Sequence, residues 1–470
     1  MAAQSGDTLS VIDTSFLNLE REATHMHVGG ITVFAGPPLD GDALYAHVES
    51  RLHLVPRYRQ KVVWPGLELG RPSWIDDPCF ALDYHVRHTA LPQPGDTDQL
   101  QRLAGRVFSQ RLDRDKPLWE MWLVEGLADG RFAIIHKTHH ALIDGMSGVD
   151  LLSLLFDITP EPREVDPPAQ PWQPGPAPSA LGMRAKAVAE IAGRPLAIAG
   201  RAVGAVRRPA AAAGQALEGA AGIRDLLVRP MLSPAPSTPL NTSIGPHRRV
   251  RWVSAELQDF KAIKNALGGT VNDVVLAVVT GALRGWLQQR GVRTEGLELR
   301  AMVPVSVRTE DQRNQLGNQV AAMRGPLPVY AADPVERLRI IRAGMEDLKR
   351  SKQAVGAAAL TGLQEFAPPT ILAQASRINF STRLFNVIVT NVPGPQIPIY
   401  LLGRELEELI PLAFLPESHA LAFAIMSVNG RISFGLLGDR DKLHDLDTVA
   451  ELIEDSLAEL KAAAGGGAPA

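Results

Sequence analysis

Hydrophobic and polar positions along the chain predict alternating strands and helices in its N-terminal third. Residues 26–34 and 132–136 have the apolar, β-branched composition of strands, and a helix is expected over residues 43–52. Apolar positions in residues 149–156 recur at the i, i+3, i+4 spacing of another helix. Residues 1–158, the N-terminal third, are therefore expected to be a mixed α/β unit.

The same kind of pattern returns over residues 240–465. Helices are expected at residues 255–267, 273–289 and 445–462, and strands at residues 299–305, 385–389 and 421–427. From Gly465 onward the glycine- and alanine-rich end is expected to be disordered, with residues 466–470 as a tail.

The predicted units are joined by residues 159–239, which have a different composition. Eight prolines between positions 160 and 178 exclude a regular helix and indicate an extended, exposed connector. Residues 181–231 are rich in Ala and Gly and carry eight basic residues against three acidic ones. This segment is either a solvated helical linker or a basic amphipathic surface for anionic lipid, and its lack of large aromatic side chains favours the linker.

Composition narrows the class of protein. The 470 residues are 45% hydrophobic and 21% charged, as in soluble globular proteins, and 48 basic against 51 acidic residues give a net charge of −3. A net charge this close to zero gives no electrostatic reason to expect nucleic-acid binding. Cys79 is the only cysteine, which excludes an internal disulfide and a multi-thiolate zinc site and favours a reducing cytoplasm. No signal peptide and no apolar run of ~18 residues is seen, so we expect no membrane span, while binding to a membrane surface stays open.

The stretch His-His-Ala-Leu-Ile-Asp-Gly at residues 139–145 is the strongest candidate for chemistry. It follows a predicted strand and precedes a predicted helix, and such loops often carry catalytic groups. Because neighbours on a strand point to opposite faces, one of His139 and His140 should be a general base and the other should support it. Asp144 is interpreted as an orienting or structural carboxylate, and Gly145 permits a sharp turn.

Other chemistries have weaker support. His136 and His140 have the i, i+4 spacing of metal ligands, but that spacing suits a helix, and position 137 is Lys rather than the Glu of a zinc protease. Ser147 lacks the second glycine of a nucleophile elbow, and Cys79 lacks an activating neighbour. The chemistry that the sequence supports best is a histidine that removes a proton directly from the acceptor. General-base catalysis of this kind raises the rate by about 10²–10⁴-fold.

Two segments of the second half contain candidate polar groups. In residues 269–273, Thr270 or Asn272 should cap the following helix. Asn272 is alternatively a donor to an oxyanion or to a substrate hydroxyl, and Asp273 a counter-charge to a buried arginine. Residues 390–395, Thr-Asn-Val-Pro-Gly-Pro, are expected to form a stiff turn after a strand.

Taken in order, these motifs resemble those of the bacterial wax ester synthase/diacylglycerol acyltransferase family. The matching residues are 112–114, 117–119, 139–145, 271–274, 304–308, 316–318, 391–395 and 427–430. They extend over most of the chain, from near Asp13 to about Asp439. The His-His-x-x-x-Asp-Gly motif alone is shared with a wider superfamily that includes chloramphenicol acetyltransferase and peptide condensation domains. Val428 departs from the family, which often has an aromatic residue there, so a stacking role at that position is in doubt.

The resemblance implies a mixed α/β (α+β) fold of two chloramphenicol-acetyltransferase-like lobes, each a mixed sheet flanked by helices, with a substrate tunnel between them. Acyl-CoA and an acceptor alcohol would reach the centre from different ends. His140 would take the hydroxyl proton with His139 as a supporting residue. Asp144 would pair with an arginine, for which Arg308 is the candidate.

The resemblance also gives Asn272 and Asp273 a functional role, because they match the family's second motif. Pro117, Leu118 and Trp119 would shape the acyl channel, although Trp119 is equally well read as a core aromatic.

We therefore expect an O-acyltransferase that moves a long-chain acyl group from CoA to diacylglycerol or to a long-chain alcohol. It would use no cofactor and form no acyl-enzyme, and it would lie in the cytoplasm or peripherally on a membrane or lipid droplet. A condensation-type enzyme that uses carrier-bound acyl groups and a non-catalytic lipid-binding protein are the alternatives.

Overall fold

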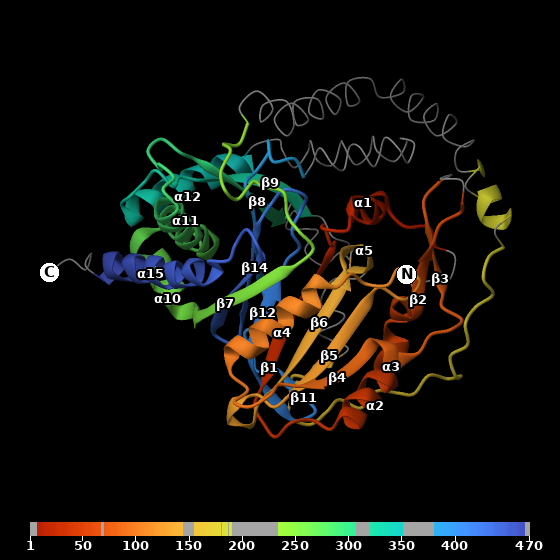
Figure 1. The fold of residues 1–470 in the computed structure, drawn as a ribbon. Helices are drawn as coiled ribbons and strands as arrows, with labels where there is room; N and C mark the ends of the chain where they lie inside the picture. The colour runs from red at the N-terminus through yellow and green to blue at the C-terminus, as the bar shows by residue number, and fades with distance from the viewer. Residues whose placement is uncertain are drawn as a thin grey trace, which may run out of the picture.

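Two six-stranded β-sheets lie side by side, with helices on their outer faces (Figure 1). The computed structural model describes residues 7–66, 70–143, 155–179, 181–186, 188–189, 234–306, 320–350 and 380–465.

The first sheet has the strand order β11-β12-β1-β6-β5-β4. Its strands are β1 (His27–Phe34), β4 (Val86–Ala90), β5 (Trp119–Glu125), β6 (Phe132–His139), β11 (Tyr400–Leu401) and β12 (Arg404–Leu412). Strand β6 is antiparallel to both of its neighbours, β1 and β5, whereas β4 runs parallel to β5. The second half of the chain completes this sheet, because β12 pairs antiparallel with β1, Ile410 lying opposite Ile31.

The second sheet has the order β7-β14-β13-β10-β8-β9. Its strands are β7 (Arg248–Glu256), β8 (Leu299–Ser306), β9 (Val320–Leu327), β10 (Val387–Pro393), β13 (Leu421–Val428) and β14 (Arg431–Asp439). Strand β10 runs parallel to both of its neighbours, and the other pairs are antiparallel. Both sheets are therefore mixed, as the resemblance implied.

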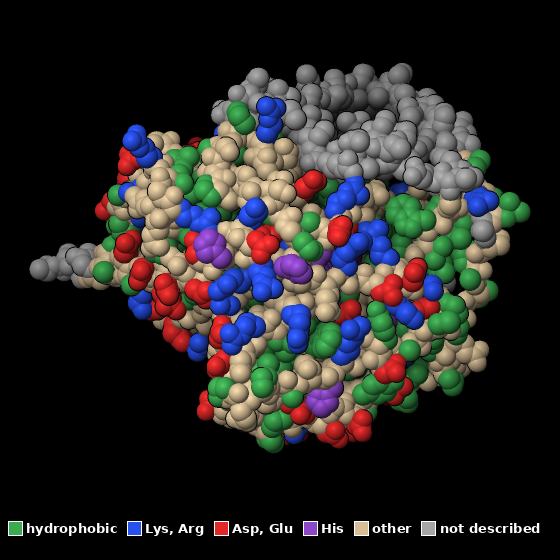
Figure 2. Space-filling view, in the orientation of Figure 1, with side chains coloured by type: hydrophobic (Ala, Val, Ile, Leu, Met, Phe, Trp, Pro, Cys, Tyr) green, Lys and Arg blue, Asp and Glu red, His purple; other side chains and the backbone are tan. Residues whose placement is uncertain are grey.

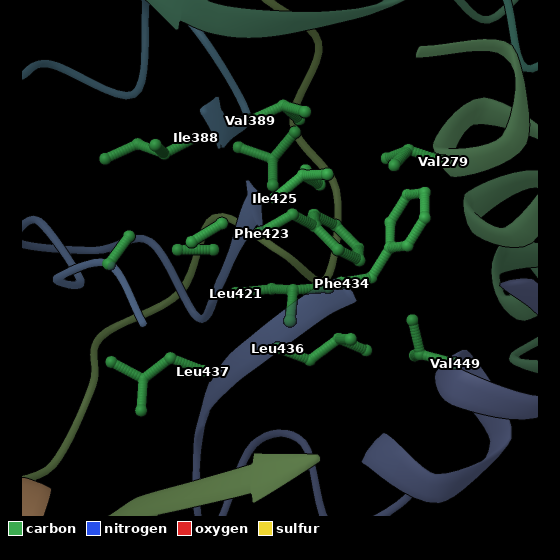
Figure 3. Packing of buried hydrophobic residues seen from close by; sticks show 14 of the residues in the cluster. Val279, Ile388, Val389, Leu421, Phe423, Ile425, Phe434, Leu436, Leu437 and Val449 are labelled. Carbon is green, nitrogen blue, oxygen red and sulfur yellow. The ribbon is translucent and has the colours of Figure 1, made fainter. Parts of the chain in front are cut away.

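Helices cover the sheets and enclose the core. They are α1 (Val11–Leu19), α2 (Gly41–Arg51), α3 (Leu82–His85), α4 (Thr97–Ser109), α5 (His140–Ile143), α10 (Leu257–Leu267), α11 (Val271–Gln289), α12 (Pro334–Arg350) and α15 (Leu446–Gly465), with a small sheet of β2 (Gln60–Val63) and β3 (Ser73–Asp76) at one side. In the second sheet, Phe434 of β14 points toward α11 and α15, which contribute Val279 and Val449 (Figure 3).

The described helices were also compared with the requirements of a membrane span. No single one has the necessary length and hydropathy; the pair Leu257–Leu267 and Val271–Gln289 passes by length and composition, but it is bent by 99°.

Most predicted elements are present, with four corrections. Ala255 belongs to β7, where it pairs with Ile432 of β14, so helix α10 starts only at Leu257. Residues 390–393 are not a turn but the end of β10, because they pair in parallel with β13. Strand β10 also begins at Val387, two residues later than expected. Gly465 is the last residue of α15 rather than part of a disordered tail.

Three predictions fall wholly or largely outside the described residues. These are the helix at 149–156, the tail at 466–470 and most of the segment 181–231, of which residues 181–186 and 188–189 are described and helical.

Candidate active site

His140 lies where a strand of the first sheet becomes a helix. Strand β6 ends at His139 and α5 begins at His140, whose backbone N–H donates to the carbonyl of Met26 (2.8 Å). The His140 ring stacks on Phe16 of α1, with centroids 4.0 Å apart, and meets the edge of Phe414 at 5.7 Å. Two aromatic rings from opposite ends of the sequence thus restrict the orientation of a partly exposed imidazole.

His139 is enclosed behind His140 and is 1% exposed. Its Nδ1 accepts a hydrogen bond from the backbone N–H of Ala141 (3.1 Å). Burial, together with the positive charge of Arg114, lowers the pKa of His139 well below its usual value, so the ring is neutral. A neutral ring that accepts at Nδ1 carries its proton on Nε2. The pattern of one supporting and one more exposed histidine matches the arrangement expected from the sequence, although the catalytic roles stay predictions.

A buried carboxylate faces His139 and was not found by sequence reasoning. Glu20 directly follows α1, its side chain is 1% exposed, and its Oε2 lies 4.0 Å from Nε2 of His139. Arg114 donates from Nε to the same oxygen (2.7 Å), and Arg111 lies 3.5 Å from it. Arg114 also donates to the carbonyl of Leu17 (2.7 Å), which fixes the end of α1. The available signal was Arg114, which belongs to the motif at 112–114.

A cavity of about 200 Å³ lies beside this site, between segments from the two halves of the chain. Its lining residues are Leu19, Thr24, Met26, Phe380, Ser381, Thr382, Glu417 and Ser418. The ring of Phe380 contacts that of Phe414 (centroids 5.7 Å apart), which in turn meets His140. The cavity wall is therefore connected to the histidine through one aromatic pair; a continuous tunnel stays a prediction.

Pro117, Leu118 and Trp119 are all buried at the start of β5. The carbonyl of Leu118 accepts the backbone N–H of His139 (2.9 Å), which anchors the end of β6. Trp119 donates from Nε1 to the carbonyl of Tyr58 (2.8 Å) and stacks on His85, with centroids 4.6 Å apart. These contacts place Trp119 in the core of the first sheet, and a role of the three residues in an acyl channel stays a prediction.

At the start of α11, two of the motif residues, Thr270 and Asp273, cap the helix. Thr270 caps the helix as predicted, and Asp273 completes a capping box by accepting from the backbone N–H of Thr270 (2.8 Å). Asn272 does not cap; its Oδ1 accepts a hydrogen bond from the amide of Asn391 in β10 (3.2 Å). Asp273 was predicted to balance the charge of a buried arginine, but among the described residues no arginine forms an ion pair with it.

Asp144, Gly145 and Arg308 lie outside the described residues, so the proposed Asp144–Arg308 pair stays a prediction. Within the described ranges, no group of three His, Cys, Asp or Glu side chains is arranged to hold a metal ion.

Comparisons with known proteins agree with this architecture. The model of the wax ester synthase/diacylglycerol acyltransferase catalytic domain matches residues 9–275, and that of the WS/DGAT C-terminal domain matches residues 316–461. The chain belongs to this family. Two relatives from Mycobacterium tuberculosis, both named diacylglycerol O-acyltransferase, are 33% identical to it; the alignments cover 97% of this chain and 90% of one relative, and 98% and 100% for the other.

Solved structures show the same fold. A wax ester synthase/diacylglycerol acyltransferase from Marinobacter aquaeolei VT8 superposes with a TM-score of 0.67 and 28% identity, over 97% of this chain and 100% of that one. The first condensation domain of the calcium-dependent antibiotic synthetase gives a TM-score of 0.58 at 15% identity, over 98% and 97%, which shows the fold alone. This WS/DGAT-family protein is therefore an acyltransferase that acts on diacylglycerol or an alcohol, as the resemblance implied.

Proposed function

We propose that His140 is the general base of a direct transfer from acyl-CoA to the acceptor alcohol, without an acyl-enzyme. The imidazole takes the hydroxyl proton while the alcohol oxygen attacks the thioester carbonyl. As the tetrahedral intermediate collapses, the C–S bond breaks, and the CoA sulfur receives the proton held on His140. The products are the ester and free CoA, so atoms and charges balance with no cofactor.

The placement of His140 is the observation that carries this proposal. The ring lies at the junction of both halves of the chain, fixed between Phe16 and Phe414, so its orientation is set before a substrate binds. His139, neutral and bonded to the Ala141 amide, holds the turn but has its Nδ1 occupied. The more exposed histidine is therefore the better base.

Thiol release from palmitoyl-CoA tests this assignment. Purified protein is given dioleoylglycerol or hexadecanol as acceptor, beside the variants His140→Ala and His444→Ala, the second of which changes an exposed histidine. We expect acceptor-dependent release that falls by about 10²-fold or more in His140→Ala and is unchanged in His444→Ala. Equal activity of His140→Ala and the parent would refute the proposal.

The same assay separates the alternatives. Transfer from an acyl-phosphopantetheinyl carrier protein but not from free acyl-CoA would identify a condensation-type donor. Palmitoyl-CoA that labels the protein covalently in the absence of alcohol, detected by intact mass, would refute the direct mechanism.

We further propose that the protein binds lipid surfaces peripherally, at a membrane or a lipid droplet. Hydrophobic side chains gather over β2 and β3 at the right of the face in Figure 2. Trp64, directly after β2, is 38% exposed, and Leu181 and Val188 in the helical stretch beyond it are 76% and 53% exposed. Arg184 joins this stretch to the same region by donating to the carbonyl of Pro65 (3.4 Å).

Vesicle flotation tests this surface. We expect the parent protein to float with vesicles containing anionic lipid and the double variant Trp64→Ser/Leu181→Ser to float less, while Tyr330→Ser, which changes an exposed aromatic residue elsewhere, has no effect. Equal flotation of all three proteins would refute the assignment.

A further inference from the structure

Two buried polar atoms of neighbouring side chains lie behind the proposed base, and neither has a hydrogen-bond partner among the described residues. They are Nε2 of His139 and Oε1 of Glu20, and the second oxygen of that carboxylate, Oε2, lies 4.0 Å from Nε2. A buried donor or acceptor without a partner costs free energy, so such a pair at one place calls for an explanation.

The chemistry of the two groups is complementary. His139 accepts the Ala141 N–H at Nδ1, so its proton is on Nε2, and Nε2 lies 4.0 Å from a carboxylate oxygen of Glu20. A separation of 4.0 Å is longer than a hydrogen bond by about 1 Å. Hydrogen bonds of catalytic groups are often long without substrate and shorten when it binds.

We propose that Glu20 is a positioning residue for acyl transfer, acting on the base through His139. Its carboxylate holds His139 in the Nε2–H tautomer, and Nδ1 then remains free to accept the Ala141 amide. That amide belongs to the first turn of α5, which begins with His140. The proposal rests on the assignment of His140 as the base.

The charge of Glu20 has a second consequence. Arg111 and Arg114 lie against this carboxylate, and both lower the pKa of His139 by their positive charge, after the larger effect of burial. Without Glu20, two guanidinium groups would face the histidine pair uncompensated. Positive charge there disfavours the imidazolium that forms on His140 when it takes the proton.

The support for Glu20 is rigid because buried groups fix the chain before Arg111. Lys137, on the same strand as His139, is fully buried and donates to the carbonyls of Val107 (3.1 Å) and Gln110 (2.8 Å) at the end of α4. His27 contacts the carbonyl of Phe108 in the same turn through Nε2 (3.1 Å). The arginines that hold Glu20 are thus tied to the strand that carries His139.

Steady-state kinetics of Glu20→Gln provide the first test, with Glu22→Gln as the matched control. Glu22 is exposed and only two residues away. We expect kcat of Glu20→Gln to fall about 10- to 100-fold, as when a residue bonded to a metal-ligating histidine is removed, with KM for palmitoyl-CoA and dioleoylglycerol unchanged. Glu20→Asp, which keeps the charge, should recover part of kcat, and Glu22→Gln should match the parent.

The tautomer of His139 provides a readout that a purely structural role would not change. In protein labelled with ¹⁵N-histidine, the His139 signals, assigned by their loss in His139→Asn, should show a protonated Nε2 in the parent and a mixture of tautomers in Glu20→Gln. A parent-like tautomer and kcat in Glu20→Gln would overturn the proposal. Equal losses of kcat in Glu20→Gln and Glu20→Asp with a parent-like tautomer would also overturn it.

The His140→Ala variant distinguishes a failure of the Glu20 proposal from a failure of the proposed function. If His140→Ala is inactive and Glu20→Gln behaves as the parent, only the role of Glu20 is refuted. If His140→Ala is fully active, the base itself has been assigned wrongly, and the present proposal falls with it.

Discussion

His85 should make the stability of the first sheet sensitive to acid. The ring is 1% exposed, stacks on Trp119 at 4.6 Å, and donates from Nδ1 to the Trp119 carbonyl (2.8 Å). Burial is the main cause that lowers the pKa of His85 from 6.5 to about 4. The unfolded chain therefore binds a proton on this residue at pH values where the folded protein does not.

The size of the effect follows from these two pKa values. Because the unfolded state holds the extra proton, the free energy of unfolding falls as the pH drops from 6.5 toward 4. With a folded pKa of about 4, the loss is about 2 kcal/mol at pH 5 and reaches about 3.4 kcal/mol below pH 4. Above about pH 7.5 the ring is neutral in both states and contributes no dependence on pH.

The variant His85→Gln isolates this contribution, because its amide still donates to the Trp119 carbonyl but does not titrate. Urea unfolding followed by tryptophan fluorescence at pH 7.5 and pH 5.0 gives the acid-induced loss of stability in each protein. We expect that loss to be about 2 kcal/mol smaller in His85→Gln than in the parent. His444→Gln, which changes an exposed histidine outside the first sheet, should keep the parent's loss. An equal loss in His85→Gln and the parent would show that burial does not hold this ring neutral.

Three further substitutions test the packing around the site. Lys137→Met removes the 3.4 Å partner of buried Glu120, which keeps Arg87 at 3.5 Å, and takes the Lys137 donor away from the carbonyls of Val107 and Gln110. It should lower the free energy of unfolding by about 3 kcal/mol, which Glu120→Gln in the same chain should partly restore in urea titrations. Trp119→Ala should cost about 3–5 kcal/mol but leave the preference between decanoyl- and palmitoyl-CoA unchanged; a shifted preference would place Trp119 in the acyl channel. Gly435→Ala would put a Cβ 1.8 Å from the carbonyl oxygen of Pro411, so it should abolish soluble expression; a normal yield would contradict the close contact of the sheets.

Local patterns were enough to predict helices and strands in which apolar residues recur with a clear helical or strand period. Helix α11 and strand β8 lie within two residues of their predicted bounds, because a long apolar helix and a buried strand have unambiguous patterns. No such local pattern indicated that β12, from the second half of the chain, joins the first sheet. Its pairing of Ile410 with Ile31 joins residues far apart in the sequence, and no local pattern records the partner.

The same difference applies to the candidate site. His139 and His140 were found because two adjacent histidines at the end of a strand form a local motif. Phe16, Glu20 and Phe414 were missed because each is an ordinary residue in its own segment. They become partners of the histidines only after α1 and the chain beyond β12 are brought to the end of β6.

Because β12 joins the first sheet, both halves of the chain are needed to position the ring of His140. Strand β12 pairs with β1, and the chain leaves β12 two residues before Phe414, which therefore reaches the His140 ring. Arg248 of β7 forms a second connection, since its guanidinium donates to the carbonyl of Ala23 just before β1. Separating the halves would expose an unpaired edge on β1 and remove one of the two rings against His140. The geometry of the proposed base is thus a property of the joined sheets, and the His-His motif alone could not create it.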